Sequence, residues 1–235
     1  MGGDRSREEF GLDWSTDTLV FWALAAVALT VSIVIDSESF ERFYGPLSPV
    51  VVTIIAAVIG AISLRSLRAR GWLRASARPA KHLWRAGFAG MAFATSAAAF
   101  DSVIHFPEDM NVAWPHSVLF YPAIAFVAEV AFHIAPLAVL IALLGWRFSG
   151  EKDTRRVWTT IAVVTAIETV FQTLDALGGD DKRLALFVAP QLAAVGAFQL
   201  MTFRRNGLAA LVSFRLGYYL VWHIIWGYVR LTVLF

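Results

Sequence analysis

The sequence predicts an all-α protein, a polytopic transmembrane helical bundle of about seven spans. Hydrophobic residues make up 58% of the 235-residue chain and charged residues only 16%, which is far more apolar than a soluble domain. The apolar residues form runs of about 20, long enough to cross a hydrocarbon core of roughly 30 Å. Segments of about ten residues with alternating polarity, typical of transmembrane β-barrels, do not occur.

The expected elements follow the apolar runs in order. The polar stretch 1–18 precedes the first long run, a pattern that favours a cytoplasmic N-terminus before an uncleaved first span. The rest of the chain, 19–235, is expected to form a single transmembrane domain. Its expected spans are 19–35, 48–64, 86–105, 117–146, 157–177, 184–203 and 207–229.

The connections between the spans alternate in charge, which predicts the orientation. Arg and Lys are concentrated in 65–85, 147–156 and 204–206, whereas the other three connections carry few. Because basic loops stay on the cytoplasmic side, we expect the N-terminus inside and the C-terminus outside a cell membrane crossed several times. The net positive charge is therefore a signature of topology, and no nucleic-acid partner is expected. The chain contains no cysteine, which excludes disulfides and thiol catalysis.

Ionisable residues inside the spans are the first candidates for function. Glu129, Glu168 and Arg215 lie deep in the fourth, fifth and seventh spans, where an unpaired charge costs several kcal/mol. At a rise of about 1.5 Å per residue, the three fall within a turn or two of one level. His133 follows Glu129 by four residues and shares its helix face. We therefore expect an inner cluster of Glu129, His133, Glu168 and Arg215.

A second group of ionisable residues lies nearer the outer ends of the spans. We call Asp101, His105, Asp175 and His223 the outer cluster. Polar side chains in this layer often hold helices together through hydrogen bonds, and packing is the interpretation that we favour for it. Haem ligation by His105 and His223 has no supporting motif. A retinal Schiff base is excluded because the last three spans contain no lysine.

Three segments resemble the motifs of a known family. Residues 128–133 read AEVAFH, residues 171–175 read FQTLD, and residues 205–210 read RNGLAA. They resemble, in the same order, the Glu-Glu-x-x-Phe-Arg, Phe-x-x-x-His and Arg-x-Gly-Leu regions of the CAAX-protease and bacteriocin-processing (CPBP) intramembrane metalloproteases. The resemblance covers about residues 117–227. It implies a helical bundle with a metal-dependent site that activates water for peptide hydrolysis.

The resemblance also indicates what would carry the chemistry. An active relative would use Glu129 and His133 catalytically, with zinc as cofactor and Glu129, Glu168 and His223 as the candidate ligands. The chain departs from the family at Ala128, His133, Asp175, Arg215 and Tyr219, where the motifs have Glu, Arg, His, His and Asn or Asp. Arg215 is the decisive change, because a guanidinium is a permanent cation without a lone pair for a metal.

Three functions remain open from the sequence. The favoured one is a non-catalytic relative with an ion-pair cluster at the former active site. It is embedded in the lipid bilayer, and its former active site is retained either for packing or for binding a membrane protein, a peptide segment or a lipid. The second is an active intramembrane metalloprotease with altered ligands. The third is a transporter or proton relay that uses the intramembrane carboxylates. The sequence sets no oligomeric state.

Overall fold

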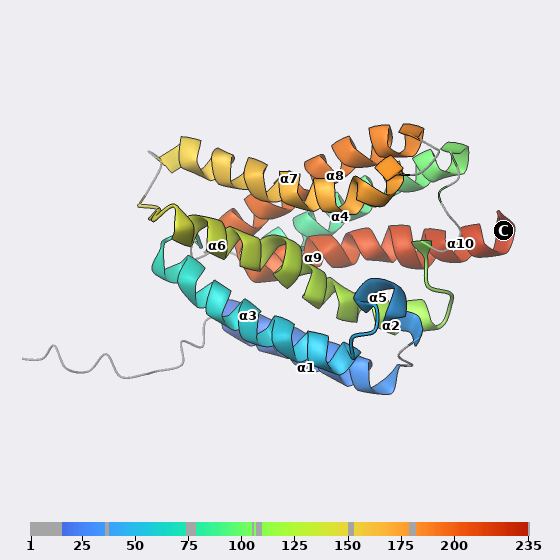
Figure 1. The fold of residues 1–235 in the computed structure, drawn as a ribbon, viewed down its shortest axis with the longest axis horizontal. Coiled ribbons are helices and arrows are strands. Elements are labelled where there is room, and N and C mark those ends of the chain that lie inside the picture. Colours follow the sequence, from blue (N-terminus) through green and yellow to red (C-terminus); the bar gives the residue numbers. More distant parts are fainter. Residues whose placement is uncertain are drawn as a thin grey trace, which may run out of the picture.

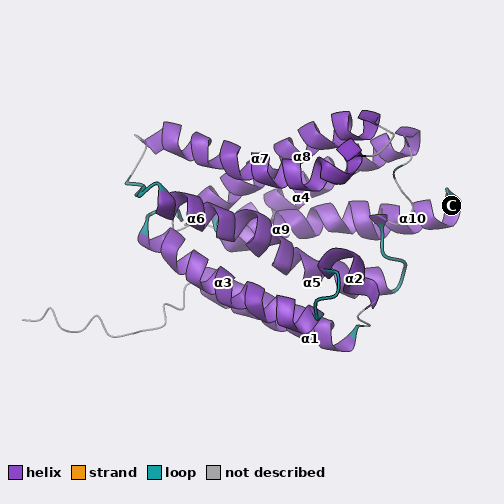
Figure 2. Cartoon of the chain, in the orientation of Figure 1, coloured by secondary structure: helices purple, strands orange, loops and turns teal. Residues whose placement is uncertain are grey.

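The computed structural model describes residues 16–35, 38–73, 79–104, 106, 110–149, 153–178 and 182–234. Over these residues the chain forms helices and no strand (Figures 1 and 2). Seven of the helices are long and apolar enough to cross a membrane. The predicted all-α fold is therefore confirmed, and the chain is a multi-pass membrane protein. Residues 1–15 of the expected N-terminal segment are not among the described residues.

The helices follow the predicted order, with a short extra helix after the first. The single-helix spans and the extra helix are α1 (Thr16–Val34), α2 (Glu38–Tyr44), α3 (Pro49–Ala69), α4 (Pro79–Ile104), α7 (Thr154–Gly178) and α8 (Lys182–Asn206). The fourth span comprises α5 (His116–Ala128), the π-helical η2 (Glu129–Ile134) and α6 (Ala135–Leu143). The seventh comprises α9 (Leu208–Tyr219), the π-helical η4 (Leu220–Ile225) and α10 (Trp226–Val233).

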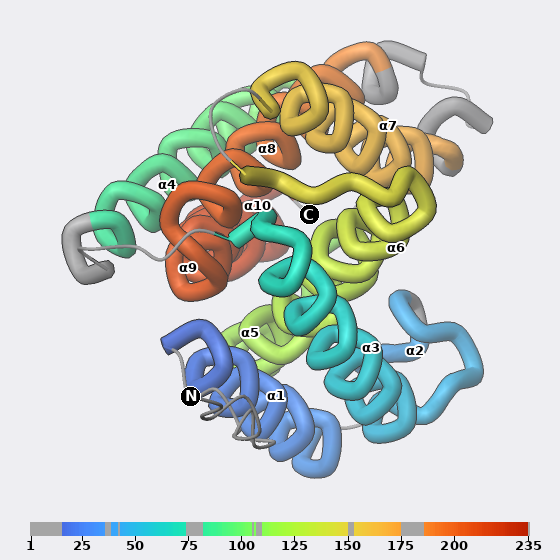
Figure 3. Tube along the Cα trace, turned by 90° about the vertical axis from the view of Figure 1, so that its left-hand side faces the viewer, coloured from blue at the N-terminus to red at the C-terminus, as the bar shows by residue number. Residues whose placement is uncertain are grey.

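The spans form three layers. In Figure 1, α1 and α3 lie on one side and α7, α8 and α4 on the other, with α5–α6 and α9–α10 between them. The end-on view of Figure 3 shows the same layers, with α9 between α4 and α1, and α1 packs against both α5 and α9. The two middle spans are the ones interrupted by π-helical turns, and they carry the buried side chains of Glu129, His133, Arg215 and Arg230.

Glycine brings α4 and α9 into close backbone contact. A Cβ atom on Gly90 would lie 2.0 Å from the carbonyl oxygen of Phe214, and one on Gly217 would lie 2.3 Å from that of Gly87. No other residue fits these positions without displacing the backbone. Close approach of small residues is a main source of helix association in lipid, where exclusion of water contributes little.

The described parts of the three basic connections lie at one end of the bundle. The N–H of Phe148 donates to the carbonyl oxygen of Arg70 at 2.8 Å, which joins the connections after α3 and α6. Arg204, at the end of α8, donates to the carbonyl oxygen of Trp72 at 3.0 Å and lies over the rings of Trp72 and Phe148. The sequence grouped these connections by charge, and the structure places them together in space.

The ends of the described chain lie at opposite ends of the bundle. Asp17, in the first turn of α1, accepts the backbone N–H of Leu208 at the start of α9. From there the seventh span runs 26 residues to Val233 at the far end, where the C-terminus lies in Figure 1. Seven crossings would place the two ends on opposite sides of a membrane, which agrees with this arrangement. The cytoplasmic placement of the α1 end stays a prediction from the basic connections.

Candidate functional site

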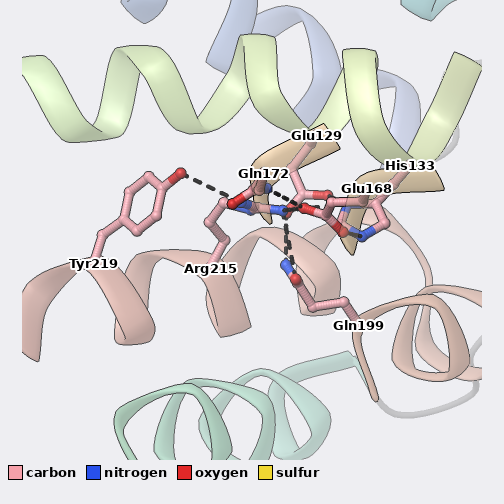
Figure 4. A network of polar contacts seen from close by, with 7 residues as sticks. All are labelled: Glu129, His133, Glu168, Gln172, Gln199, Arg215 and Tyr219. Atoms are coloured by element: carbon pink, nitrogen blue, oxygen red, sulfur yellow. Dashed lines mark hydrogen bonds and ion pairs between the residues drawn. The ribbon is translucent and has the colours of Figure 1, made fainter. Parts of the chain in front are cut away.

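The structure brings the four side chains of the inner cluster together at the centre of the bundle (Figure 4). Glu129 and His133 come from η2, Glu168 from α7 and Arg215 from α9. All four are buried. The inner cluster therefore joins three spans at one level, as their depths along the helices predicted.

Arg215 lies between the two carboxylates. Its Nε donates directly to Oε1 of Glu129, and its Nη2 lies 3.7 Å from Oε1 of Glu168. Its Nη1 donates to the hydroxyl of Tyr219 at 3.3 Å. A single guanidinium thus contacts both carboxylates in a low-dielectric interior, where a buried charge without a partner is costly.

His133 presents each ring nitrogen to a different carboxylate. Nδ1 lies 2.8 Å from Oε2 of Glu129, within hydrogen-bond range. Nε2 lies 3.1 Å from Oε2 of Glu168, at an angle that gives an electrostatic contact without a directed hydrogen bond. The imidazole therefore fills the space between Glu129 and Glu168 on the side away from Tyr219.

Two glutamine side chains complete the inner cluster. Gln199, from α8, donates to Oε1 of Glu129 at 2.8 Å and accepts from Nη2 of Arg215 at 3.4 Å. Gln172, one turn after Glu168, donates to Oε1 of that carboxylate at 3.0 Å. Gln199 was not among the predicted site residues. Its signal in the sequence was weak, because the apolar sixth span contains a second amide, Gln191.

A π-helical turn carries both Glu129 and His133. The N–H of Ala135 bonds to the carbonyl oxygen of Val130, five residues back. Pro136 follows directly, and a proline has no N–H with which to continue the regular ladder. The second π-helical turn, η4, carries His223. π-helical turns inside α-helices frequently mark functional positions, and here each of them bears an intramembrane histidine.

Asp101 of the outer cluster is completely buried and fully hydrogen-bonded. Its Oδ1 accepts the backbone N–H of Phe106 at 2.6 Å. Its Oδ2 accepts from the indole N–H of Trp226 at 2.6 Å and from Nε of Arg230 at 2.9 Å. Arg230 also donates to the side chain of Asn111 at 2.8 Å. This network joins the connection before α5 to the last turns of the seventh span.

His223 belongs to the same layer through Asn111. Its Nδ1 lies 3.4 Å from Nδ2 of Asn111, and its ring stacks on Tyr121 and meets the edge of Tyr219. Neither Asn111 nor Arg230 was predicted, because Asn111 lies in a connection and Arg230 one residue beyond the expected end of the last span. Two expected members, His105 and the side chain of Asp175, lie outside what the structure describes.

Glu168, which depth along the span selected, is the member of the inner cluster from α7. Glu168 contacts both His133 and Arg215. Phe171, which the motif comparison aligned with the family, is exposed and packs against Phe132 with ring centroids 5.4 Å apart. Position along the helix therefore located the α7 member of the inner cluster better than the motif did.

The inner cluster does not fit a catalytic zinc site. In the described part of the chain, no group of three or more His, Asp or Glu side chains is arranged to hold a metal ion. The expected ligand set of Glu129, Glu168 and His223 is thus not assembled. His223 packs against Tyr121 and Asn111, while the guanidinium of Arg215 contacts both carboxylates. A catalytic zinc needs an open coordination position, and here Arg215 and His133 fill the space around the carboxylates.

Comparison with protein-family models finds no match, and comparisons with curated proteins and with solved structures find none. The similarity to the CPBP proteases rests on the short sequence motifs alone. A multi-pass helical bundle with a buried cluster of ionisable side chains in mutual contact at its centre is what the fold and the site establish about this protein.

Proposed function

We propose that this protein is a non-catalytic relative of the CPBP intramembrane proteases. In this view it lies in the cell membrane, and the inner cluster occupies the position that the metal centre has in the active proteases. The observation that carries the proposal is the contact of Arg215 with both Glu129 and Glu168. It supplies with a side chain the positive charge that a protease would take from a metal ion.

Electrostatics supports this reading over an active metalloprotease. Two unit positive charges 4 Å apart repel by about 4 kcal/mol at an effective dielectric constant of about 20, and a divalent ion doubles that figure. A zinc ion beside Glu129 would meet this repulsion from Arg215. It would also have to displace the hydrogen bonds that Gln199 and His133 make to the same carboxylate.

The role that remains for the inner cluster is to hold the bundle together. It joins η2, α7 and α9 directly, and Gln199 adds α8. A bundle fixed in this way presents its outer helical faces as a rigid surface in the bilayer. We therefore favour a scaffold that binds another membrane protein or a peptide segment.

The direct test combines metal analysis with hydrolysis. Purified protein in detergent is assayed for zinc content and for cleavage of a quenched membrane peptide, with Glu129→Gln as the matched variant. We expect less than stoichiometric zinc and no cleavage above the blank in either protein. Stoichiometric zinc together with cleavage that Glu129→Gln abolishes would establish the active protease instead.

A second variant, Arg215→His, tests whether Arg215 is the group that excludes the metal. Arg215→His places an imidazole where the family motif has one and removes the permanent cation. We expect this variant to bind more zinc than the parent, because a neutral imidazole donates a lone pair and no longer repels the ion. Equal zinc content in both would show that Arg215 is not what excludes the metal.

A proton relay is the second candidate, favoured by one observation. Polar contacts continue outward from Arg215 through Tyr219 to His223, which lies beside Asn111. Intramembrane carboxylates and histidines in a row are typical of proton paths. Proteoliposomes with a pH gradient and an internal dye test it. A relay predicts proton flux that Glu168→Gln abolishes, whereas the scaffold predicts leakage equal to that of empty liposomes.

A further inference from the structure

We propose that α1 is a movable cover over the inner cluster, held closed by a hydrogen bond between Asp17 and the start of α9. The proposal concerns access to the cluster. It stands independently of whether the cluster has a chemical role.

The facing sides of α1 and α9 match in spacing. Asp17, Phe21 and Leu24 follow one another at spacings of four and three residues, so they lie on one face of α1. Leu208, Val212 and Arg215 have the same spacing on α9. The two helices begin at the same end of the bundle. From this end of the bundle inward, the α1–α9 pair therefore presents first the contact of Asp17 with Leu208, then an apolar layer, and then the guanidinium of Arg215.

A small cavity lies beneath α1. It is bounded by α1, α5, η2 and α9, and its volume is about 10 Å³, close to the space that one water molecule needs. Phe21, Leu24, Phe126 and Val212 are among its apolar lining residues, and Glu129 and Arg215 supply its polar groups. Among the four ionisable side chains of the inner cluster, that of Arg215 is also the most exposed, at 9%. The cavity thus reaches the cluster from the α1 side.

A hydrogen bond between α1 and α9 closes the α1 side of the cavity. Oδ1 of Asp17 accepts the N–H of Leu208 at 2.8 Å. The residue before α9 offers no cap of its own, because Gly207 has no side chain. Gly207 also has a φ of +82°, and a Cβ there would lie 2.7 Å from Oδ1 of Asp17. Glycine is therefore required both by the backbone and by the approach of the carboxylate.

The packing of α9 is closer towards α4 than towards α1. The backbone of α9 approaches α4 closely at Gly90 and Gly217. Towards α1 it makes fewer contacts, and these include the Asp17 hydrogen bond and the apolar layer below it. On its other side α1 is joined to α3, where Arg68 donates to Thr18 at 2.7 Å. Loss of the Asp17 contact would free α1 from α9 while α4 and α9 stay together.

The absence of cysteine from the sequence makes the test simple. Val212→Cys places one thiol in the cavity wall, and N-ethylmaleimide reacts with it as a thiolate, which forms where water has access. We expect slow labelling in native membranes. We expect labelling about tenfold faster when Asp17→Ala is added, since losing one hydrogen bond to a charged group shifts an opening equilibrium by about that factor.

Two further variants make the outcome decisive. Asp17→Asn keeps an acceptor oxygen. Val212→Cys combined with Asp17→Asn should therefore be labelled at a rate near that of Val212→Cys alone. Ala97→Cys, buried in α4 away from the cavity, should label slowly with or without Asp17→Ala. Labelling of Val212→Cys that Asp17→Ala leaves unchanged would overturn the proposal, and so would equal acceleration at Ala97→Cys. Because the readout is thiol labelling, failure here is distinct from failure of the zinc and hydrolysis tests.

Discussion

Replacing Arg215 with methionine is the sharpest test of how the inner cluster stabilises the bundle. The substitution keeps an unbranched side chain but removes the cation that contacts Glu129 and Glu168. Both carboxylates stay buried, and His133 and the two glutamines are then their remaining polar contacts. Breaking a buried ion pair on one side costs about 3–5 kcal/mol, because the remaining charge is left uncompensated. We therefore expect Arg215→Met to lose about 4 kcal/mol of unfolding free energy, close to three orders of magnitude in the folding equilibrium.

The size of the effect follows from burial. Glu129 is 2% exposed and the side chain of Arg215 is 9% exposed, so water cannot solvate the orphaned carboxylate without opening the bundle. Arg205, three residues before the start of α9, is exposed. An exposed charge contributes at most about 1 kcal/mol, and Arg205→Met should leave stability nearly unchanged.

The assay is unfolding of the detergent-solubilised protein by sodium dodecyl sulfate, followed by the fluorescence of its nine tryptophans. A double variant, Arg215→Met with Glu129→Gln, removes both charges of the closest pair. It should recover at least half of the lost stability, because replacing a whole buried pair is often close to neutral. A single variant within about 1 kcal/mol of the parent, or a double variant no more stable than the single one, would refute the reasoning.

Three further predictions concern other parts of the molecule. Asp101→Leu leaves Arg230 buried without its carboxylate, so we expect a loss of about 3–5 kcal/mol in the same assay, and faster proteolysis of the connection before α5. Gly217→Ala places a methyl group 2.3 Å from the carbonyl oxygen of Gly87, and overpacking of this kind costs about 1–3 kcal/mol. The orientation predicts that an impermeant maleimide labels Ala113→Cys in intact cells but labels Ser149→Cys only after permeabilisation, since both positions are exposed at opposite ends of the bundle.

Each of these has a matched control or a contrary outcome. Ser102→Ala, an exposed neighbour of Asp101 whose hydroxyl bonds only to its own helix, should be neutral. Ala92→Leu, on the exposed face of α4, should be neutral where Gly217→Ala is not. Labelling of Ser149→Cys in intact cells, with Ala113→Cys protected, would invert the orientation.

The sequence came closest to the structure where the physics is local. A run of about 20 apolar residues satisfies the bilayer and its own backbone whatever it packs against, so the seven spans were readable. The rise per residue then placed Glu129, Glu168 and Arg215 at one level, and the structure finds them in contact. The same reasoning could not find partners that lie outside the expected spans, such as Arg230 for Asp101.

The sequence by itself determined that this is a membrane protein with charges buried too deep to stand alone. Only the tertiary structure decided how they are compensated. The contacts of Arg215 with Glu129, of Gln199 with Glu129, and of Asp17 with Leu208 join positions 86, 70 and 191 residues apart. Which faces meet depends on how each helix is rotated about its axis. That rotation is set by the packing of the whole bundle, through features such as the glycines between α4 and α9, and hydropathy along a single helix does not specify it.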